Sequence, residues 1–125
     1  MKGKILLVED DLDLMHLFND ALVSGGYQVD GFTEPSKAFS HFKDNSKDYD
    51  LVISDVRMPQ MSGLELVKKI NQVDKDVKVL LMSAFEIESD NLKELKLNEF
   101  LQKPLHIEQL INTVKKYLDK KSAGK

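Results

Sequence analysis

The chain has 125 residues, a formal net charge of −3 and no cysteine. This length suits one domain with a single substantial core, and the absence of thiols excludes disulfides, thiolate metal sites and cysteine chemistry. Lysines and acids are spread along the chain and Arg57 is the single arginine, so direct binding of DNA or RNA is not expected.

Short apolar runs alternate with segments of helical periodicity, and this alternation predicts parallel βαβ units. The run from Ile5 to Val8 is only four residues long, too short for a signal peptide or a membrane span, so a soluble cytoplasmic protein is expected. The first, third and fourth runs are continuous, which is typical of central strands covered on both faces, whereas the second is mixed and suits an edge. The expected strands cover residues 4–8, 28–32, 51–54, 77–82 and 100–102.

The intervening segments predict five helices. An apolar stripe from Leu14 to Leu22 ends at Gly25 and Gly26, a natural helix stop. Further helices are expected over residues 35–44, around 64–70, more weakly over 87–96, and over 107–118. Five βα repeats predict an open, doubly wound α/β sheet in three layers, because a closed barrel needs about eight. The domain is expected to span residues 1–121, and the polar tail 122–125 reads as a frayed end, the start of a linker or a cloning remnant.

Polar side chains follow several of these strands at their carboxyl ends, where open α/β sheets bind ligands. Glu9 and Asp10 follow the first strand, Asp55 the third, Ser83 the fourth and Lys103 the fifth. Each of these residues alone would be an ordinary helix cap, turn residue or solvated charge. Together they place carboxylates, a hydroxyl and an ammonium group at one edge of the sheet.

Clustered carboxylates without imidazole or thiolate favour a hard cation, and Mg²⁺ takes a few carboxylates while keeping water ligands. Glu9, Asp10 and Asp55 are the candidate ligands. A cation beside a lysine, a hydroxyl and a free carboxylate suits the binding of a phosphoryl group, which the carboxylate can accept as a nucleophile. Asp11 and Asp13 are interpreted instead as residues of a helix start.

The motifs "ILLVEDD", "LVISDVRMPQMSGLEL", "VLLMSA" and "FLQKP", in this order and spacing, resemble the receiver domain of two-component response regulators from Lys4 to about Lys120. The resemblance implies a flavodoxin-like fold with strand order 2-1-3-4-5. It implies that Asp55 accepts a phosphoryl group from the phosphohistidine of a histidine kinase or phosphotransfer protein. Such a domain is a signalling switch and not a metabolic enzyme, since it catalyses only its own phosphorylation and dephosphorylation.

The same resemblance assigns the other site residues. Mg²⁺ would be bound by Asp10, by Glu9 through water, by Asp55 and by the backbone carbonyl of Arg57, while Lys103 would bind a phosphoryl oxygen. The bond from Lys103 to Pro104 would be a cis peptide. In the implied switch, Ser83 moves toward the phosphoryl group and Phe100 turns inward, which changes the face formed by the fourth helix, fifth strand and fifth helix.

A downstream protein target or a fused output domain would bind to this face. A phosphorylation-dependent homodimer formed through the same face is an open alternative. Arg57 and Phe85 flank the phosphorylation site in the sequence, and we expect them to control access of water to the acyl phosphate. The stretch "ELKLNEF" lacks the small residue and glycine usual before the fifth strand, so the fourth helix is expected to be short or shifted.

Two rival functions remain. A Mg²⁺-dependent phosphatase of the haloacid dehalogenase kind also forms an aspartyl phosphate, but its first strand should carry D-x-D followed closely by Thr or Ser, whereas Asp11 and Asp13 are followed by Leu14 and Met15. A degenerate receiver that acts as a phosphorylation-independent interaction module would not need Asp55, Ser83 and Lys103 together.

Overall fold

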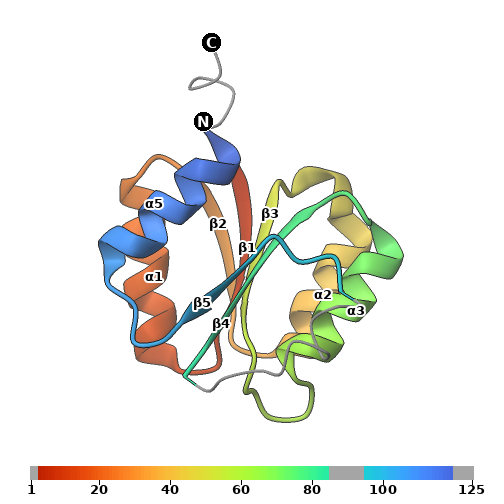
Figure 1. Cartoon of the computed structure of the whole chain (residues 1–125). Helices are drawn as coiled ribbons and strands as arrows, with labels where there is room; N and C mark the ends of the chain where they lie inside the picture. The colour runs from red at the N-terminus through yellow and green to blue at the C-terminus, as the bar shows by residue number, and fades with distance from the viewer. Residues whose placement is uncertain (1–2, 85–94, 120–125) are drawn as a thin grey trace.

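A computed structural model describes residues 3–84 and 95–119 of the protein (Figure 1). Its parallel strands form one sheet in the order β2-β1-β3-β4-β5. This order confirms the doubly wound, flavodoxin-like prediction, with the mixed strand at an edge. The strands are β1 (Lys4–Val8), β2 (Gln28–Phe32), β3 (Leu51–Asp55), β4 (Lys78–Ser83) and β5 (Glu99–Gln102).

Helices cover both faces of the sheet, so the molecule has three layers. In Figure 1, α1 and α5 lie on one side of the sheet and α2 and α3 on the other. Within the two described ranges, none of the helices is long and apolar enough to cross a membrane. The helical elements are α1 (Leu12–Ser24), α2 (Pro35–Asn45), the 3₁₀ turn η1 (Ser46–Asp48), α3 (Gly63–Val73) and α5 (Ile107–Leu118).

The helix ends follow from local sequence chemistry. The Asp11 carboxylate accepts two backbone N–H groups of the first turn of α1 at 3.0 and 3.2 Å, and Gly25 caps the other end of this helix. Pro35 occupies the first turn of α2, where its missing N–H costs nothing. Ser62 and Glu65 form a reciprocal capping box at the start of α3, which fixes the chain soon after β3.

The sheet is buried on both faces, which explains the continuous apolar runs. On the α1 and α5 side, Leu7, Ile53 and Met82 belong to one fully buried cluster. Their strand neighbours Leu6 and Val52 point the other way, into a second cluster beneath α2 and α3. The central strands are therefore rigidly held, and so are the residues at their carboxyl ends.

Some boundaries differ from the predicted ones. β3 continues to Asp55, which pairs with Met82, and β4 runs one residue later than expected, through Ser83. Pairing between strands extends the ladder past the end of each apolar run, so these polar residues belong to the strands themselves. Most of the helix expected over residues 87–96 lies outside the described residues, and its last two residues, Leu95 and Lys96, are not helical.

Candidate functional site

Three carboxylates meet at the carboxyl ends of two adjacent central strands. Glu9 and Asp10 follow β1 directly, and Asp55 is the last residue of β3. One oxygen from each carboxylate lies within 4.8 Å of the others, as the sequence predicts. Glu9 is fully buried and Asp55 is nearly so, whereas Asp10 is half-buried. This set consists of hard oxygen ligands with no imidazole or thiolate, so it could hold Mg²⁺.

Lys103, which follows β5, completes the cluster. Its Nζ donates to Glu9 Oε1 at 2.8 Å and lies 3.3 Å from Asp55 Oδ2. Its backbone N–H donates to the Ser83 carbonyl at 2.7 Å, so β4 positions the residue from the other side. The peptide bond between Lys103 and Pro104 is cis, as the resemblance to receiver domains implies.

Burial and charge act in opposite directions at this cluster. Burial raises the pKa of Glu9 to about 7, aided by the charge of Asp55 and opposed by the hydrogen bond from Lys103. Burial lowers the pKa of Lys103, but the hydrogen bond and charge of Glu9 and the charge of Asp55 outweigh it, so this pKa is raised. Lys103 therefore stays protonated, whereas Glu9 in the metal-free site binds a proton near neutral pH.

The structure places the other predicted residues as follows. Ser83 is buried at the end of β4, next to Lys103 in the backbone network. Phe100 in β5 is half-buried and packs against the cluster beneath α2 and α3. Arg57 is exposed in the loop after β3. Phe85 lies outside the described residues.

Asp11 is assigned to the start of α1, because its carboxylate is occupied by the backbone N–H groups of that helix. The D-x-D pair formed with Asp13 is thus part of a helix terminus rather than of a strand end. The prediction that these two acids belong to the helix start is confirmed.

Two residues that lie against the Asp55 carbonyl, Gly63 and Ser54, are not among the predicted site residues. Gly63 approaches the Asp55 carbonyl so closely that a Cβ there would lie 2.9 Å from Val56 Cα and closer still to the Asp55 oxygen. Ser54 is fully buried and its hydroxyl donates to the Asp55 carbonyl at 2.9 Å. The available signal was the single polar residue inside the apolar run of β3 and the glycine that opens α3.

A second feature connects β5 with α5, away from the acidic cluster. Glu99 Oε1 accepts hydrogen bonds from Tyr117 at 2.7 Å and Lys116 at 3.0 Å. The Tyr117 hydrogen bond, followed by that of Lys116, lowers the pKa of Glu99. Glu99 directly precedes Phe100, so these two hydrogen bonds join the strand that contains Phe100 to α5.

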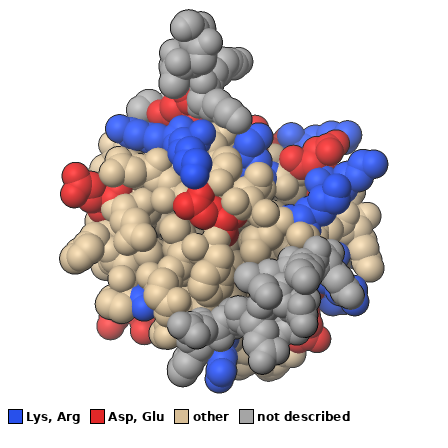
Figure 2. All heavy atoms as spheres, in the orientation of Figure 1, with Lys and Arg blue, Asp and Glu red and all other residues tan. Residues whose placement is uncertain are grey.

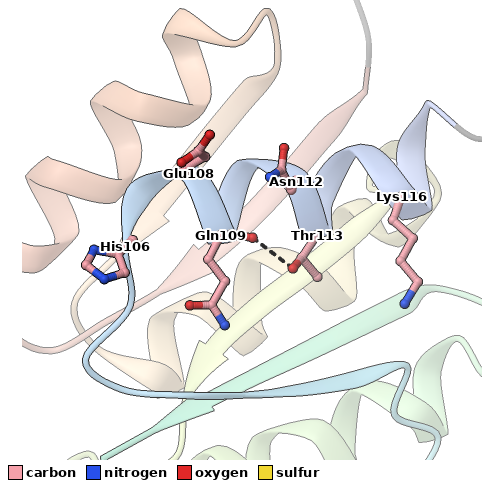
Figure 3. Close-up of a pocket in the computed structure, with 6 residues that line it drawn as sticks. All are labelled: His106, Glu108, Gln109, Asn112, Thr113 and Lys116. Atoms are coloured by element: carbon pink, nitrogen blue, oxygen red, sulfur yellow. Dashed lines mark hydrogen bonds between the residues drawn. The ribbon is translucent and has the colours of Figure 1, made fainter.

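A wide, shallow groove with a volume of about 470 Å³ runs along α5 (Figure 3). In this groove the buried Thr113 hydroxyl donates to the Gln109 carbonyl at 2.9 Å. The residues that line the groove are His106, Glu108, Gln109, Asn112, Thr113 and Lys116.

Charges on the face drawn in Figure 2 are of both signs. Among the described residues of that face, lysine and arginine side chains are interspersed with acids rather than gathered into one basic surface.

The fold and the acidic edge define an α/β domain of the kind that binds a divalent cation and a phosphoryl group at its strand ends. Residues 5–115 match the model of the response regulator receiver domain, and the chain belongs to this family. Receiver domains are phosphorylation-dependent signalling switches of two-component systems rather than metabolic enzymes. They bind Mg²⁺ and interact with histidine kinases or phosphotransfer proteins and with output domains or targets.

Relatives of similar length support this assignment. The chain is 31% identical over 120 residues to the response regulator receiver protein CpdR of Brucella abortus, covering 92% of this chain and 96% of that one. It is 32% identical over 124 residues to sporulation initiation phosphotransferase F of Bacillus subtilis, covering 98% of each. Against the transcriptional regulatory protein TctD of Salmonella typhimurium, 33% identical, it covers 97% of this chain but only 54% of the relative.

Solved structures give the same fold. The response regulator protein TrrA of Thermotoga maritima, in complex with Mg²⁺ and BeF, superposes with a TM-score of 0.82 at 33% identity, over 93% of this chain and 99% of that chain. The receiver domain of the hybrid histidine kinase CckA gives a TM-score of 0.80 at 31% identity, over 93% and 99%.

Proposed function

We propose that Asp55 is the phosphoacceptor and takes its phosphoryl group from the phosphohistidine of a histidine kinase or phosphotransfer protein. The observation that carries this proposal is the position of Asp55 Oδ2, 3.3 Å from Lys103 Nζ and within the cluster formed with Glu9 and Asp10. A carboxylate oxygen of Asp55 attacks phosphorus, the P–N bond breaks, and the imidazole leaves with the electron pair.

Asp10, Asp55, the Arg57 carbonyl and, through water, Glu9 would hold Mg²⁺. When bound, the cation supplies positive charge that offsets the repulsion between the acids and the phosphoryl oxygens. Lys103 already pairs with two of these acids, and its protonated amine is placed to bind a phosphoryl oxygen as well. With the cation bound, the site would thus offer the phosphoryl group two separate positive charges, that of the cation and that of Lys103.

Phosphorylation adds charge and acceptor oxygens at the end of β3, which the Ser83 hydroxyl of the adjacent strand can bind. We propose that Ser83 moves toward the phosphoryl group, and that this movement lets Phe100 turn inward and changes the face that contains β5 and α5. The contact of Glu99 with Tyr117 supports this route, because it joins the strand of Phe100 to α5.

This face is the proposed binding surface for a downstream target or a fused output domain. A phosphorylation-dependent homodimer through the same face is a second outcome to be tested. A cytoplasmic location, a domain spanning residues 1–121, and control of water access by Arg57 and Phe85 remain predictions.

The proposal is tested by incubating the protein with Mg²⁺ and a small phosphodonor and measuring its intact mass. We expect one added phosphoryl group, its loss in Asp55→Asn, and its retention in Asp20→Asn, which removes an exposed acid of α1. Continuous hydrolysis of the donor that does not depend on Asp55 would instead support the phosphatase alternative. An unmodified native protein would support a phosphorylation-independent interaction module.

A further inference from the structure

Ser54 is an unusual residue for its position in β3. It is fully buried, and Val52 and Val56, two residues before and two residues after it, belong to the apolar cluster beneath α2 and α3. A hydroxyl group in such surroundings is costly unless it forms a hydrogen bond. Here it donates to the carbonyl of the next residue, Asp55, at 2.9 Å.

The peptide unit that receives this bond is also fixed by other contacts. Its N–H group, on Val56, donates to the Met82 carbonyl of β4 at 2.9 Å. Gly63 packs against its carbonyl side at a distance that no larger residue allows, and the Gly63 N–H donates to the Val56 carbonyl at 2.7 Å. Both polar groups of the Asp55–Val56 peptide are therefore hydrogen-bonded, and its carbonyl is packed against a neighbouring backbone.

This peptide lies between the proposed metal ligands. The carboxylate of Asp55 comes just before it, and the backbone carbonyl of Arg57 comes two residues after Asp55. A rotation of the peptide would move both ligands relative to each other. Mg²⁺ demands nearly ideal octahedral geometry, so a small change in this spacing weakens its binding.

We propose that Ser54 is a positioning residue, whose buried hydroxyl holds the Asp55–Val56 peptide so that Asp55 and the Arg57 carbonyl are spaced for Mg²⁺. The proposal rests on the function proposed above, because it takes Asp55 and Arg57 as metal ligands. In this role Ser54 acts through the backbone of its neighbour Asp55 rather than as a ligand.

The test compares two buried hydroxyls that each donate to a backbone carbonyl at 2.9 Å, Ser54 and Thr113. Mg²⁺ binding is measured by calorimetry for the native protein, Ser54→Ala and Thr113→Ala, and the folded fraction of each is checked by urea unfolding. We expect Ser54→Ala to weaken Mg²⁺ binding by about tenfold, the usual effect of losing a residue that orients a metal ligand. Thr113→Ala, on α5, should bind Mg²⁺ like the native protein.

Binding within twofold of native in folded Ser54→Ala overturns the proposal, as does an equal loss in Thr113→Ala. If Ser54→Ala does not fold, Ser54→Cys replaces it, because the thiol is a weaker donor and should also reduce the affinity; native affinity in that variant overturns the proposal.

The result is independent of the phosphorylation assay. A native protein that binds Mg²⁺ but takes no phosphoryl group on Asp55 would refute the proposed function, and the calorimetry would still decide the role of Ser54. Phosphorylation of Asp55 together with unchanged Mg²⁺ binding in Ser54→Ala would refute the role of Ser54 and leave the proposed function intact.

Discussion

Glu9 is the residue whose ionisation is most strongly altered at the site. Its side chain is fully buried beside Lys103 and Asp55, and burial raises its pKa to about 7. A carboxyl group with a raised pKa binds its proton more tightly in the folded than in the unfolded state. Its contribution to the stability of the metal-free protein is therefore present below the unfolded pKa and is lost as pH rises through about 7.

The same proton competes with a cation. We predict that Mg²⁺ binds more weakly at pH 6 than at pH 8, and that binding at pH 6 releases a proton from Glu9. Calorimetry in two buffers with different ionisation enthalpies measures both quantities. Glu9→Gln, which cannot ionise, should flatten the pH dependence. Equal affinities at the two pH values, without proton release, would contradict the raised pKa.

Gln60 carries backbone strain in the loop between β3 and α3. Its φ is 71°, in the left-handed region that favours glycine. We predict that Gln60→Gly raises the free energy of unfolding by about 0.5 kcal/mol, since the relief of roughly 1 kcal/mol exceeds the entropy cost of glycine. Gln60→Val should lower it by about 1 kcal/mol, because a β-branched side chain fits this region poorly. Urea unfolding measures both changes, and a rise for valine or a fall for glycine would refute the explanation.

At the scale of elements, the segment before β5 is held by a side chain of α3 rather than by a glycine turn. The Asn71 Oδ1 accepts the Lys96 N–H at 2.9 Å, and the Asn71 Nδ2 contacts the Lys96 carbonyl at 3.5 Å. Two residues later, Asn98 forms two hydrogen bonds with Val79 of β4. Its side-chain Oδ1 accepts the Val79 N–H, and its backbone N–H donates to the Val79 carbonyl, at 2.8 Å each. These contacts account for a sequence that lacks the usual small residue and glycine at this point.

We therefore predict that Asn71→Ala lowers the free energy of unfolding by about 1 kcal/mol, the usual net value of such hydrogen bonds. It should also speed hydrogen exchange at the Lys96 amide more than at amides of the central strands. Gln72→Ala, an exposed change at the next position of α3, is the matched control and should alter neither quantity. Unchanged exchange at Lys96 in Asn71→Ala would show that the bond does not hold this segment.

The elements that the sequence predicts well are those in which several local signals agree. β1 and β2 have the predicted bounds, and the caps at Asp11 and Gly25 fix α1. The apolar runs predict that β3 and β4 end before Asp55 and Ser83, because apolar patterning does not report the backbone pairing that includes these two residues. Contacts such as Asn71 with Lys96 join residues far apart in the sequence and need the tertiary structure to be seen.

The residues of the candidate site also divide into those that the sequence predicts and those that only the tertiary structure shows. Glu9, Asp10, Asp55 and Lys103 could be assembled from the sequence, because parallel strands bring their carboxyl ends to one edge. The role proposed for Ser54 could not, since a lone polar residue in an apolar run marks an unusual position but does not show which backbone group its side chain contacts.

At the scale of the whole molecule, the site joins parts of the chain that meet only in the folded state. Its acids come from β1 and β3, and Lys103 follows β5, 94 residues after Glu9. The two apolar clusters, one on each face of the sheet, hold these strands in place. A cation bound by such residues has no comparable partner in the unfolded chain, so its binding energy stabilises the entire fold.

We therefore predict that Mg²⁺ at 100 times its dissociation constant raises the free energy of unfolding by about 2.7 kcal/mol. Urea unfolding with and without Mg²⁺, at matched ionic strength in KCl, measures the increment and removes general salt effects. Asp10→Asn should lose most of the increment, because Asp10 is a proposed ligand in the acidic cluster. Asp13→Asn, which removes an exposed acid in the first turn of α1, should keep it. If both variants retained the full increment, the cation would be stabilising the protein at some place other than the strand ends.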